Sequence, residues 1–248
     1  MNDTLKNRFF SERIRKLEEK LGYTFKDKKL ALSALTHKSF VAEYDKDLED
    51  YEVLEFLGDA VLSLIVSEIL IKKFPHAKEG ELSQLRSAII SESFLARLAR
   101  KIDLQEIVLL SKGEISQKGM ERDSLLCDVF EAVFGAVYVD SNYFIDPPRQ
   151  IFNRLFKEYI LKCIEEDDIP RDYKSLLQII TQRRFGTVPK YRFISAKGPE
   201  HEKIFEMECI VDKELKTRGK GRSKKEAETK AAKEAYEILT EEKKDENI

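Results

Sequence analysis

The first two thirds of the chain carry apolar residues at the three- and four-residue spacing of amphipathic helices. This spacing runs from Arg13 to about Lys162, and glycine and proline fall mostly between the apolar runs. The most apolar helix is predicted over residues 51–73, and a second strongly apolar helix over residues 124–141. The pattern therefore predicts an all-α first domain.

The pattern changes after an acidic segment at residues 165–168, which is followed by Ile169-Pro170 and is typical of a linker. Beyond it, two-residue alternation predicts half-buried strands between two helices. The predicted elements are a helix over 173–184, strands over 191–196, 204–211 and 214–218, and a helix over 223–239. We therefore predict an all-α domain at residues 1–165, a linker at 166–170, and a small α+β domain of order α-β-β-β-α at residues 171–242.

Two apolar stripes support this second domain. On the predicted strand over 204–211, one face carries Phe205, Met207, Cys209 and Val211. The last helix repeats small or apolar residues every four positions, a narrow stripe that suits close packing on a sheet. This stripe consists of Ala227, Ala231, Ala235 and Leu239.

Composition and charge narrow the class of protein. With 42% hydrophobic and 36% charged residues, the chain is globular rather than disordered or fibrous. The net charge of −2 hides an asymmetry, since residues 171–248 contain 19 Lys and Arg against 15 Asp and Glu, a net +4, and residues 1–170 contain 25 against 31, a net −6. A basic module joined to an acidic body suggests a nucleic-acid partner.

The cysteines and the apolar runs point to the cytoplasm. Three scattered cysteines, without a C-x-x-C pair, argue against a disulfide framework and a cysteine-zinc site. Residues 1–12 lack the features of a secretory signal, and no apolar run has membrane-spanning length. We expect a cytoplasmic protein without a membrane partner.

Five carboxylates interrupt the two most apolar helices. Glu52, Glu55 and Asp59 fall within an arc of roughly 60° on the first helix, and Asp128 and Glu131 share a face of the second. Like charges so placed repel, and all-oxygen ligands favour Mg²⁺, Mn²⁺ or Ca²⁺. The residues alone predict a metal site that can hydrolyse phosphodiesters, although ordinary solvated helix positions remain an alternative.

Four motifs in order resemble the ribonuclease III family. They are ALTHKSF at 34–40, EFLGDAVL at 55–62, KEGELSQLRS at 78–87 and DVFEAVFGAVY at 128–138. The resemblance implies that Glu55, Asp59, Asp128 and Glu131 are the catalytic residues and metal ligands, with Mg²⁺ as the cofactor and Mn²⁺ able to substitute. It also implies outer carboxylates at Glu52 and Glu79, and a homodimer in which the signature helix, residues 51–73, pairs with its counterpart.

The chain departs from the family pattern at two places near this site. Tyr51-Glu52-Val53 stands where the family commonly has Asn-Glu-Arg, and Cys127 where it has a small residue. Neither change removes a carboxylate. We expect Val53 to alter the dimer seam.

A basic segment at residues 219–232 precedes and begins the last helix. Lys220, Arg222, Lys224 and Lys225 are predicted at the helix start, where they oppose the helix dipole unless an anion such as phosphate binds there. Ser223 and Glu226 are spaced as a capping box. A lysine-rich solvated helix is the alternative reading of this segment taken alone.

Residues 171–239 as a whole resemble a double-stranded RNA-binding domain. Such domains read the minor groove with the first helix and a loop, and hold phosphates with lysines. The resemblance implies Gln178 and Gln182 on the first helix, His201 in the GPEH loop, and Lys220, Lys224 and Lys225 as the RNA-binding residues. Ile179 stands where many members carry a Glu that contacts ribose, which weakens the expected minor-groove contact.

Together the resemblances imply an endoribonuclease that cleaves double-stranded RNA, such as ribosomal RNA precursors and structured messenger RNA, to 5′-phosphates with short 3′ overhangs. One alternative is a catalytically silent RNA-binding or ribosomal protein of the same fold. The other is a metal-dependent phosphohydrolase of small molecules with an unrelated basic tail. The four retained carboxylates disfavour the first, and the complete RNA-binding module disfavours the second.

Overall fold

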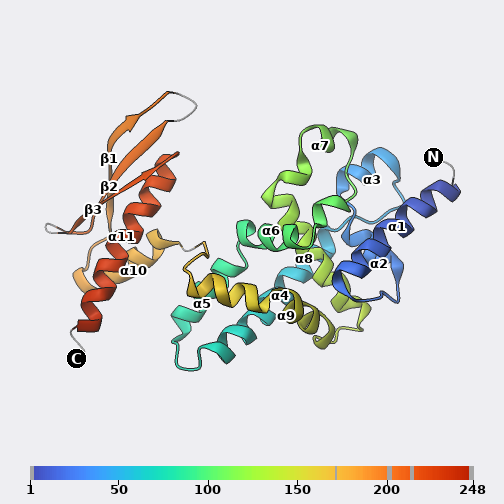
Figure 1. Ribbon diagram of the computed structural model, residues 1–248, viewed down its shortest axis with the longest axis horizontal. Helices are drawn as coiled ribbons and strands as arrows, with labels where there is room; N and C mark the ends of the chain where they lie inside the picture. Colours follow the sequence, from blue (N-terminus) through green and yellow to red (C-terminus); the bar gives the residue numbers. More distant parts are fainter. Residues whose placement is uncertain (1–2, 171, 200–202, 213–214, 246–248) are drawn as a thin grey trace. The chain divides into compact units, whose positions relative to one another are not determined.

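The computed structural model describes residues 3–170, 172–199, 203–212 and 215–245, with side chains described from residue 7 to residue 240. It divides into two compact units, Met1–Pro170 and Arg171–Ile248. They are called the nuclease unit and the RNA-binding unit, after the functions that the sequence resemblance leads us to expect of them. Each unit has its own hydrophobic core. They are drawn in Figure 1 and are taken separately below.

The nuclease unit is helical throughout the part that the structure describes, apart from an isolated bridge between Thr36 and Leu109. This confirms the predicted all-α domain. Its helices are α1 (Asp3–Leu21), α2 (Lys28–Ala34), α3 (Lys38–Tyr44), α4 (Glu52–Lys73), α5 (Glu79–Ile89), α6 (Glu92–Lys101), α7 (Lys112–Ser116), α8 (Asp123–Asp140) and α9 (Asp146–Glu165), with 3₁₀ turns η1 (Leu104–Glu106) and η2 (Gly119–Glu121).

Helix α8 runs through the middle of the nuclease unit, with α4, α6 and α9 around it (Figure 1). Twelve of its 18 residues are buried, so the helix is apolar on most sides rather than amphipathic. Phe130 and Phe134 form ring contacts with Phe156 and Phe152 of α9 at centroid distances of 5.4 and 5.5 Å. These edge-on contacts fix α8 against α9.

The ends of the two most apolar helices lie close to their predicted positions. Helix α4 begins one residue after the predicted start and ends at Lys73, as predicted, while α8 begins one residue early and ends one residue early. Pro147 and Pro148 lie in the first turn of α9, where a missing backbone N–H costs little.

The RNA-binding unit has the predicted order α-β-β-β-α. Its elements are α10 (Tyr173–Phe185), β1 (Lys190–Lys197), β2 (Ile204–Ile210), β3 (Lys216–Gly221) and α11 (Lys224–Asp245). The strands form one antiparallel sheet in the order β1-β2-β3. The predicted stripe on the last helix is completely buried, and it packs against β2 and β3. Its members are Ala227, Ala231, Ala235 and Leu239.

The third strand lies further along the chain than predicted. It covers Lys216–Gly221 rather than 214–218, which places Lys220 on the strand and starts α11 at Lys224. The reason is contact between β3 and α11: a Cβ atom on Gly219 would lie 2.0 Å from the carbonyl oxygen of Ala227. The glycines that resemble a loop in the sequence are therefore strand residues over which the helix backbone passes closely.

The predicted linker is in part packed on the nuclease unit. Ile169 is 6% exposed and belongs to the core of that unit. Arg97 of α6 donates a 2.6 Å hydrogen bond to the Asp168 carboxylate.

The three cysteines, Cys127, Cys163 and Cys209, are free and buried. Among the described helices, none combines the length and apolar character that a bilayer crossing requires.

Candidate active site

Glycines let α4 and α8 cross at backbone contact. A Cβ atom on Gly58 would lie 1.8 Å from the carbonyl oxygen of Glu131, and one on Gly135 would lie 2.1 Å from that of Leu54. Both distances are far below van der Waals contact. The crossing therefore brings the acidic stripe of α4 next to the acidic pair of α8.

The structure brings together Glu55 and Asp59 of α4 with Asp128 and Glu131 of α8. Burial raises the pKa of Glu55, and the Asp128 charge raises it further. Burial also raises the pKa of Glu131, to about 8, with the Asp59 charge as the next cause. Carboxylates on two different helices thus repel one another across the crossing, as the sequence predicts for uncompensated acids.

Asp128 shows the same behaviour from a different neighbour. Its pKa is raised first by burial and then by the charge of Glu92 on α6. The pKa is thus raised for Glu55, Asp128 and Glu131, and a cation with oxygen ligands would stabilise their ionised forms. The all-oxygen donor set that these three form with Asp59 fits a hard divalent ion. The residues therefore satisfy the chemical requirement of the predicted metal centre.

Three neighbours of the cluster were absent from the predicted set. The Lys38 ammonium forms an ion pair with the Glu52 carboxylate at 2.9 Å, and the charge of Glu92 raises the pKa of Asp128. The Cys127 Sγ lies 3.6 Å from Oε1 of Glu131. Potential ligand atoms of Cys127, Asp128 and Glu131 all lie within 4.8 Å of one another. The Cys127 signal was visible in the sequence as a departure from the family pattern, whereas Glu92 reaches the site only through the packing of α6 on α8.

The two predicted outer carboxylates lie in different places. Glu52 is exposed at the start of α4, near Glu55. Glu79 begins α5, which packs on the far part of α4, and it accepts a 2.8 Å hydrogen bond from Ser83. Since α4 has 22 residues and a rise of about 1.5 Å each, Glu79 lies at the other end of that helix from the cluster.

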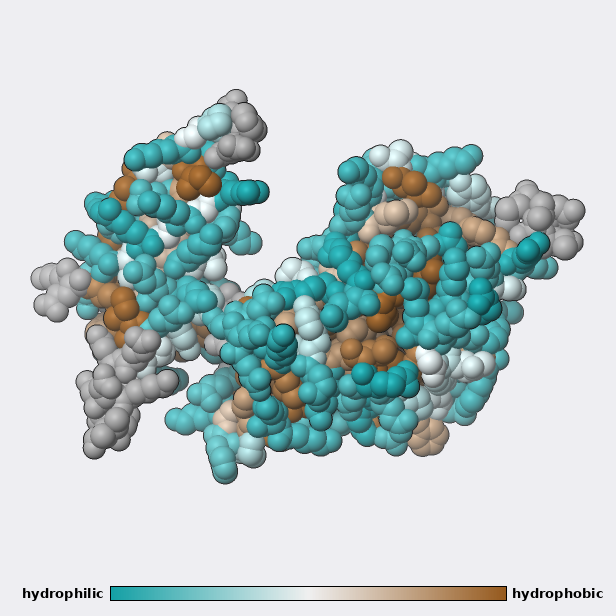
Figure 2. Space-filling view, viewed as in Figure 1, coloured by the Kyte–Doolittle hydropathy of each residue, from teal (hydrophilic) through white to brown (hydrophobic). Residues whose placement is uncertain are grey.

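An apolar stripe runs along α4 beside the carboxylates. Val53, Phe56, Leu64 and Ile71 are 79%, 81%, 49% and 58% exposed, and at 100° per residue they lie on one side of the helix. Brown apolar areas interrupt the hydrophilic surface of the nuclease unit in Figure 2. A row of exposed large apolar residues of this kind marks an interaction surface.

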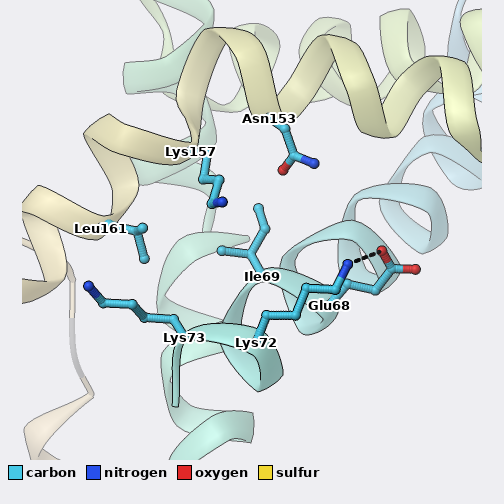
Figure 3. Close-up of a pocket in the computed structure, with 7 residues that line it drawn as sticks. All are labelled: Glu68, Ile69, Lys72, Lys73, Asn153, Lys157 and Leu161. Atoms are coloured by element: carbon cyan, nitrogen blue, oxygen red, sulfur yellow. Dashed lines mark ion pairs between the residues drawn. The ribbon is translucent and has the colours of Figure 1, made fainter. Parts of the chain in front are cut away.

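A hollow of about 210 Å³ lies between α4 and α9, away from the cluster (Figure 3). Lysine side chains point into it from both helices, and Lys72 pairs with Glu68 at 4.0 Å. None of the predicted site residues lines this hollow. The first residue of α4 in its lining is Glu68, nine positions after Asp59. Its lining consists of Glu68, Ile69, Lys72, Lys73, Asn153, Lys157 and Leu161.

The predicted RNA-binding residues that the structure describes are all exposed. Gln178 and Gln182 lie on α10, Lys220 on β3, and Lys224 and Lys225 in the first turn of α11. Their exposure leaves them available to a ligand. His201 lies outside the described residues.

Two of the predicted RNA-binding lysines, Lys220 and Lys224, each contact another residue of the RNA-binding unit. Lys220 lies 4.0 Å from the Glu206 carboxylate, and the Lys224 ammonium lies 5.3 Å from the centre of the Phe193 ring. Ile179, between the two glutamines in the sequence, is 51% exposed.

The predicted capping box forms in an altered way. The Ser223 hydroxyl accepts a 3.1 Å hydrogen bond from the Glu226 N–H, as expected. The Glu226 carboxylate accepts from the backbone N–H of Arg222 at 2.8 Å, one residue before the serine. The side chains of Ser223 and Glu226 thus cap the start of α11, and Lys224 and Lys225 follow directly after Ser223.

Comparison with known proteins gives the family. A Ribonuclease-III-like family model matches residues 27–156, and a Double-stranded RNA binding motif model matches residues 173–239. The chain is 44% identical over 228 residues to "Ribonuclease 3" of Aquifex aeolicus, covering 92% of this chain and 98% of the relative. The chain belongs to the ribonuclease III family. "Ribonuclease 3" of Natranaerobius thermophilus is 45% identical, with 92% and 96% covered.

A solved ribonuclease III structure agrees with this assignment for the nuclease unit. The nuclease domain from Campylobacter jejuni is 42% identical, with a TM-score of 0.54, and the match covers 58% of this chain and 96% of that one. Its description concerns a flexible region involved in dimer formation of that domain. The 228-residue match to the relative from Aquifex aeolicus is longer than the nuclease unit, so the likeness to ribonuclease III extends into the RNA-binding unit.

Proposed function

We propose that this chain is a divalent-metal-dependent endoribonuclease that cleaves double-stranded RNA as a homodimer. The observation that carries the proposal is the crossing of α4 and α8, which joins four carboxylates in a chain that also carries a complete RNA-binding unit. Membership of the ribonuclease III family supplies the reaction: hydrolysis that leaves 5′-phosphates and short 3′ overhangs.

Glu55, Asp59, Asp128 and Glu131 are the catalytic residues and would hold Mg²⁺, or Mn²⁺ in its place. A bound divalent ion would supply charge stabilisation and an activated water. The protein's own contribution is to hold the carboxylates of two helices at fixed separation, which the glycine contact between α4 and α8 ensures. Lys38 restrains the outer carboxylate of Glu52.

The apolar stripe on α4 is the dimer seam. The stripe lies directly beside the carboxylates on the same helix, so pairing of two α4 helices would bring two clusters to one surface. Glu79, at the far end of α4, is the second outer carboxylate, and a partner with α4 antiparallel would bring it toward the other subunit's cluster. Val53 lies in the seam, where it adds apolar area.

The RNA-binding unit holds the duplex. Gln178, Gln182 and His201 face the minor groove, while Lys220, Lys224 and Lys225 neutralise phosphates. The exposed Ile179 offers ribose no hydrogen bond, which makes phosphate contacts the larger part of the binding. The substrates are ribosomal RNA precursors and structured messenger RNA, and the free cysteines suit a cytoplasmic enzyme.

Cleavage of labelled RNA in Mg²⁺, in Ca²⁺ and in EDTA tests this proposal. We expect duplex RNA to be cut in Mg²⁺ and not in EDTA, and Glu131→Gln or Asp59→Asn to abolish cutting while duplex binding persists. No cleavage by the native protein in Mg²⁺ would leave a silent RNA-binding protein. Preference for single strands would contradict the substrate, and full activity of either variant would contradict the site.

A further inference from the structure

The acidic cluster contains one ligand atom that a magnesium enzyme does not need. Cys127 precedes Asp128 on α8 and lies one helical turn before Glu131, so its thiol and the Glu131 carboxylate project from the same side of the helix. The Sγ atom lies 3.6 Å from Oε1 of Glu131. With Asp128, these groups form a set whose ligand atoms lie within 4.8 Å of one another.

The separation matches one cation between sulfur and oxygen. Bonds of about 2.3 Å to sulfur and about 2.1 Å to oxygen, opened to a tetrahedral angle, place the two ligand atoms about 3.6 Å apart. In the structure the Cys127 thiol donates a hydrogen bond to Oε1 of Glu131 over this same distance. Thiolate is a soft ligand that selects Zn²⁺ and similar ions, whereas Mg²⁺ takes oxygen ligands in an octahedral arrangement.

We propose that Cys127, Asp128 and Glu131 form a second, inhibitory binding mode of the metal centre, which captures a thiophilic divalent cation such as Zn²⁺ or Cd²⁺. On binding, the S–H bond of Cys127 breaks, a metal–sulfur bond forms, and the proton leaves to solvent. Asp128 and Glu131 belong to both ligand sets, so an ion held with Cys127 competes for them with the ion held with the carboxylates of α4. A thiophilic ion bound in this way stops cleavage. The inference rests on the proposed function only in treating the four carboxylates as the magnesium site.

A second cysteine provides a matched control. The Cys163 Sγ also lies near a carboxylate oxygen, at 3.9 Å from Asp168. That carboxylate is paired with Arg97 at 2.6 Å, which opposes the approach of a cation. Cys163 is buried in the same unit, so Cys163→Ala removes an equivalent thiol without touching the cluster.

The first test is binding of Cd²⁺ to the full-length protein in the absence of Mg²⁺, followed by the ultraviolet absorption of a cadmium–thiolate bond. We expect the native protein and Cys163→Ala to develop this absorption with one ion per subunit. Cys127→Ala and Cys127→Ser should not develop it, and the serine variant keeps the size of the side chain if alanine impairs folding. Absorption that persists in both Cys127 variants would overturn the proposal.

The second test is cleavage of duplex RNA at fixed Mg²⁺ with increasing Zn²⁺, each variant being compared with its own rate without Zn²⁺. Because loss of even an outer partner of a metal ligand costs about 10- to 100-fold in affinity, we expect Cys127→Ala to need at least about tenfold more Zn²⁺ for half inhibition. Equal inhibition of the native protein and Cys127→Ala would contradict the inference. Absence of Mg²⁺-dependent cleavage would instead contradict the proposed function, and the cadmium absorption would still decide the role of Cys127.

Discussion

At the scale of single residues, the Glu131 carboxyl links metal binding to pH. Its pKa is raised to about 8 by burial and by the charges of Asp59 and Glu55 on α4 and Asp128 on α8. A carboxyl must lose its proton to bind a cation, so the apparent affinity for Mn²⁺ should fall by up to about tenfold per pH unit below about pH 8. Calorimetric titration at about pH 6.5 and about pH 8.5 measures this, and equal affinities would contradict it.

The same shift governs the stability of the metal-free protein. Between the ordinary pKa of 4.5 and about 8, the folded state retains a proton on Glu131 that the unfolded state has lost. The protonated Glu131 carboxyl therefore stabilises the folded state. This stabilisation is fully present below pH 4.5 and is lost as the pH rises through about 8. Thermal unfolding in EDTA should therefore show a decline in stability across this window, and Glu131→Gln should flatten it.

The residues of the cluster differ in how far the sequence could reveal them. Helical spacing alone placed five carboxylates on one side of each of two helices, among them Glu52. The resemblance to ribonuclease III then implied that the ligands are Glu55, Asp59, Asp128 and Glu131. The approach of Glu92 depends on the packing of α6 against α8, which no local pattern encodes.

At the scale of elements, the contact between α4 and α8 depends on the missing side chains of Gly58 and Gly135. Gly58→Ala should push the helices apart, because its Cβ would lie 1.8 Å from the Glu131 carbonyl oxygen. Overpacking of this kind lowers the free energy of unfolding by about 1–3 kcal/mol or more. Because the carboxylates are displaced, the variant should also lose most of its cleavage activity. Chemical denaturation and the duplex cleavage assay measure the two effects.

Gly80 in α5 is the matched control. A Cβ atom there would meet no atom within 4 Å. Gly80→Ala should therefore stabilise the protein, by up to about 1 kcal/mol, through helix propensity alone. If Gly58→Ala behaved in the same way, the contact between α4 and α8 would not be needed for the fold or the site.

The predicted elements failed where a tertiary contact overrides the local pattern. The shift of β3 to Lys216–Gly221 arises from the approach of α11 over Gly219, although glycines usually signal a loop. Ile169 likewise belongs to a segment whose acidic composition predicts a linker, yet it enters the core of the nuclease unit. Helix order and strand order were predictable because long periodic runs are local signals.

At the scale of the whole molecule, the apolar stripe on α4 predicts the oligomeric state. In a symmetric dimer Phe56, 81% exposed in one chain, would be buried twice. Burying each phenyl ring contributes about 1.5–3 kcal/mol, so Phe56→Asp should raise the dissociation constant on the order of a hundredfold or more. Sedimentation analysis measures this. Phe144→Asp, at a 67% exposed residue between α8 and α9, should leave the dimer intact.

The division of charge between the units predicts how binding depends on salt. The chain as a whole carries a net charge of −2, so affinity for RNA must come from local groups rather than from net attraction.

Removal of one phosphate contact should reduce the magnitude of the slope of log affinity against log salt concentration by about 1. It should also weaken binding to all duplexes alike. Lys225→Ala, in the first turn of α11, should show both effects when binding is measured in EDTA, where no cleavage is expected. Lys157→Ala, on α9 of the nuclease unit, removes the same charge from a residue outside the RNA-binding unit. An equal change of slope in both variants would mean that the affinity follows overall charge, and the assignment of Lys225 to a phosphate would then be wrong.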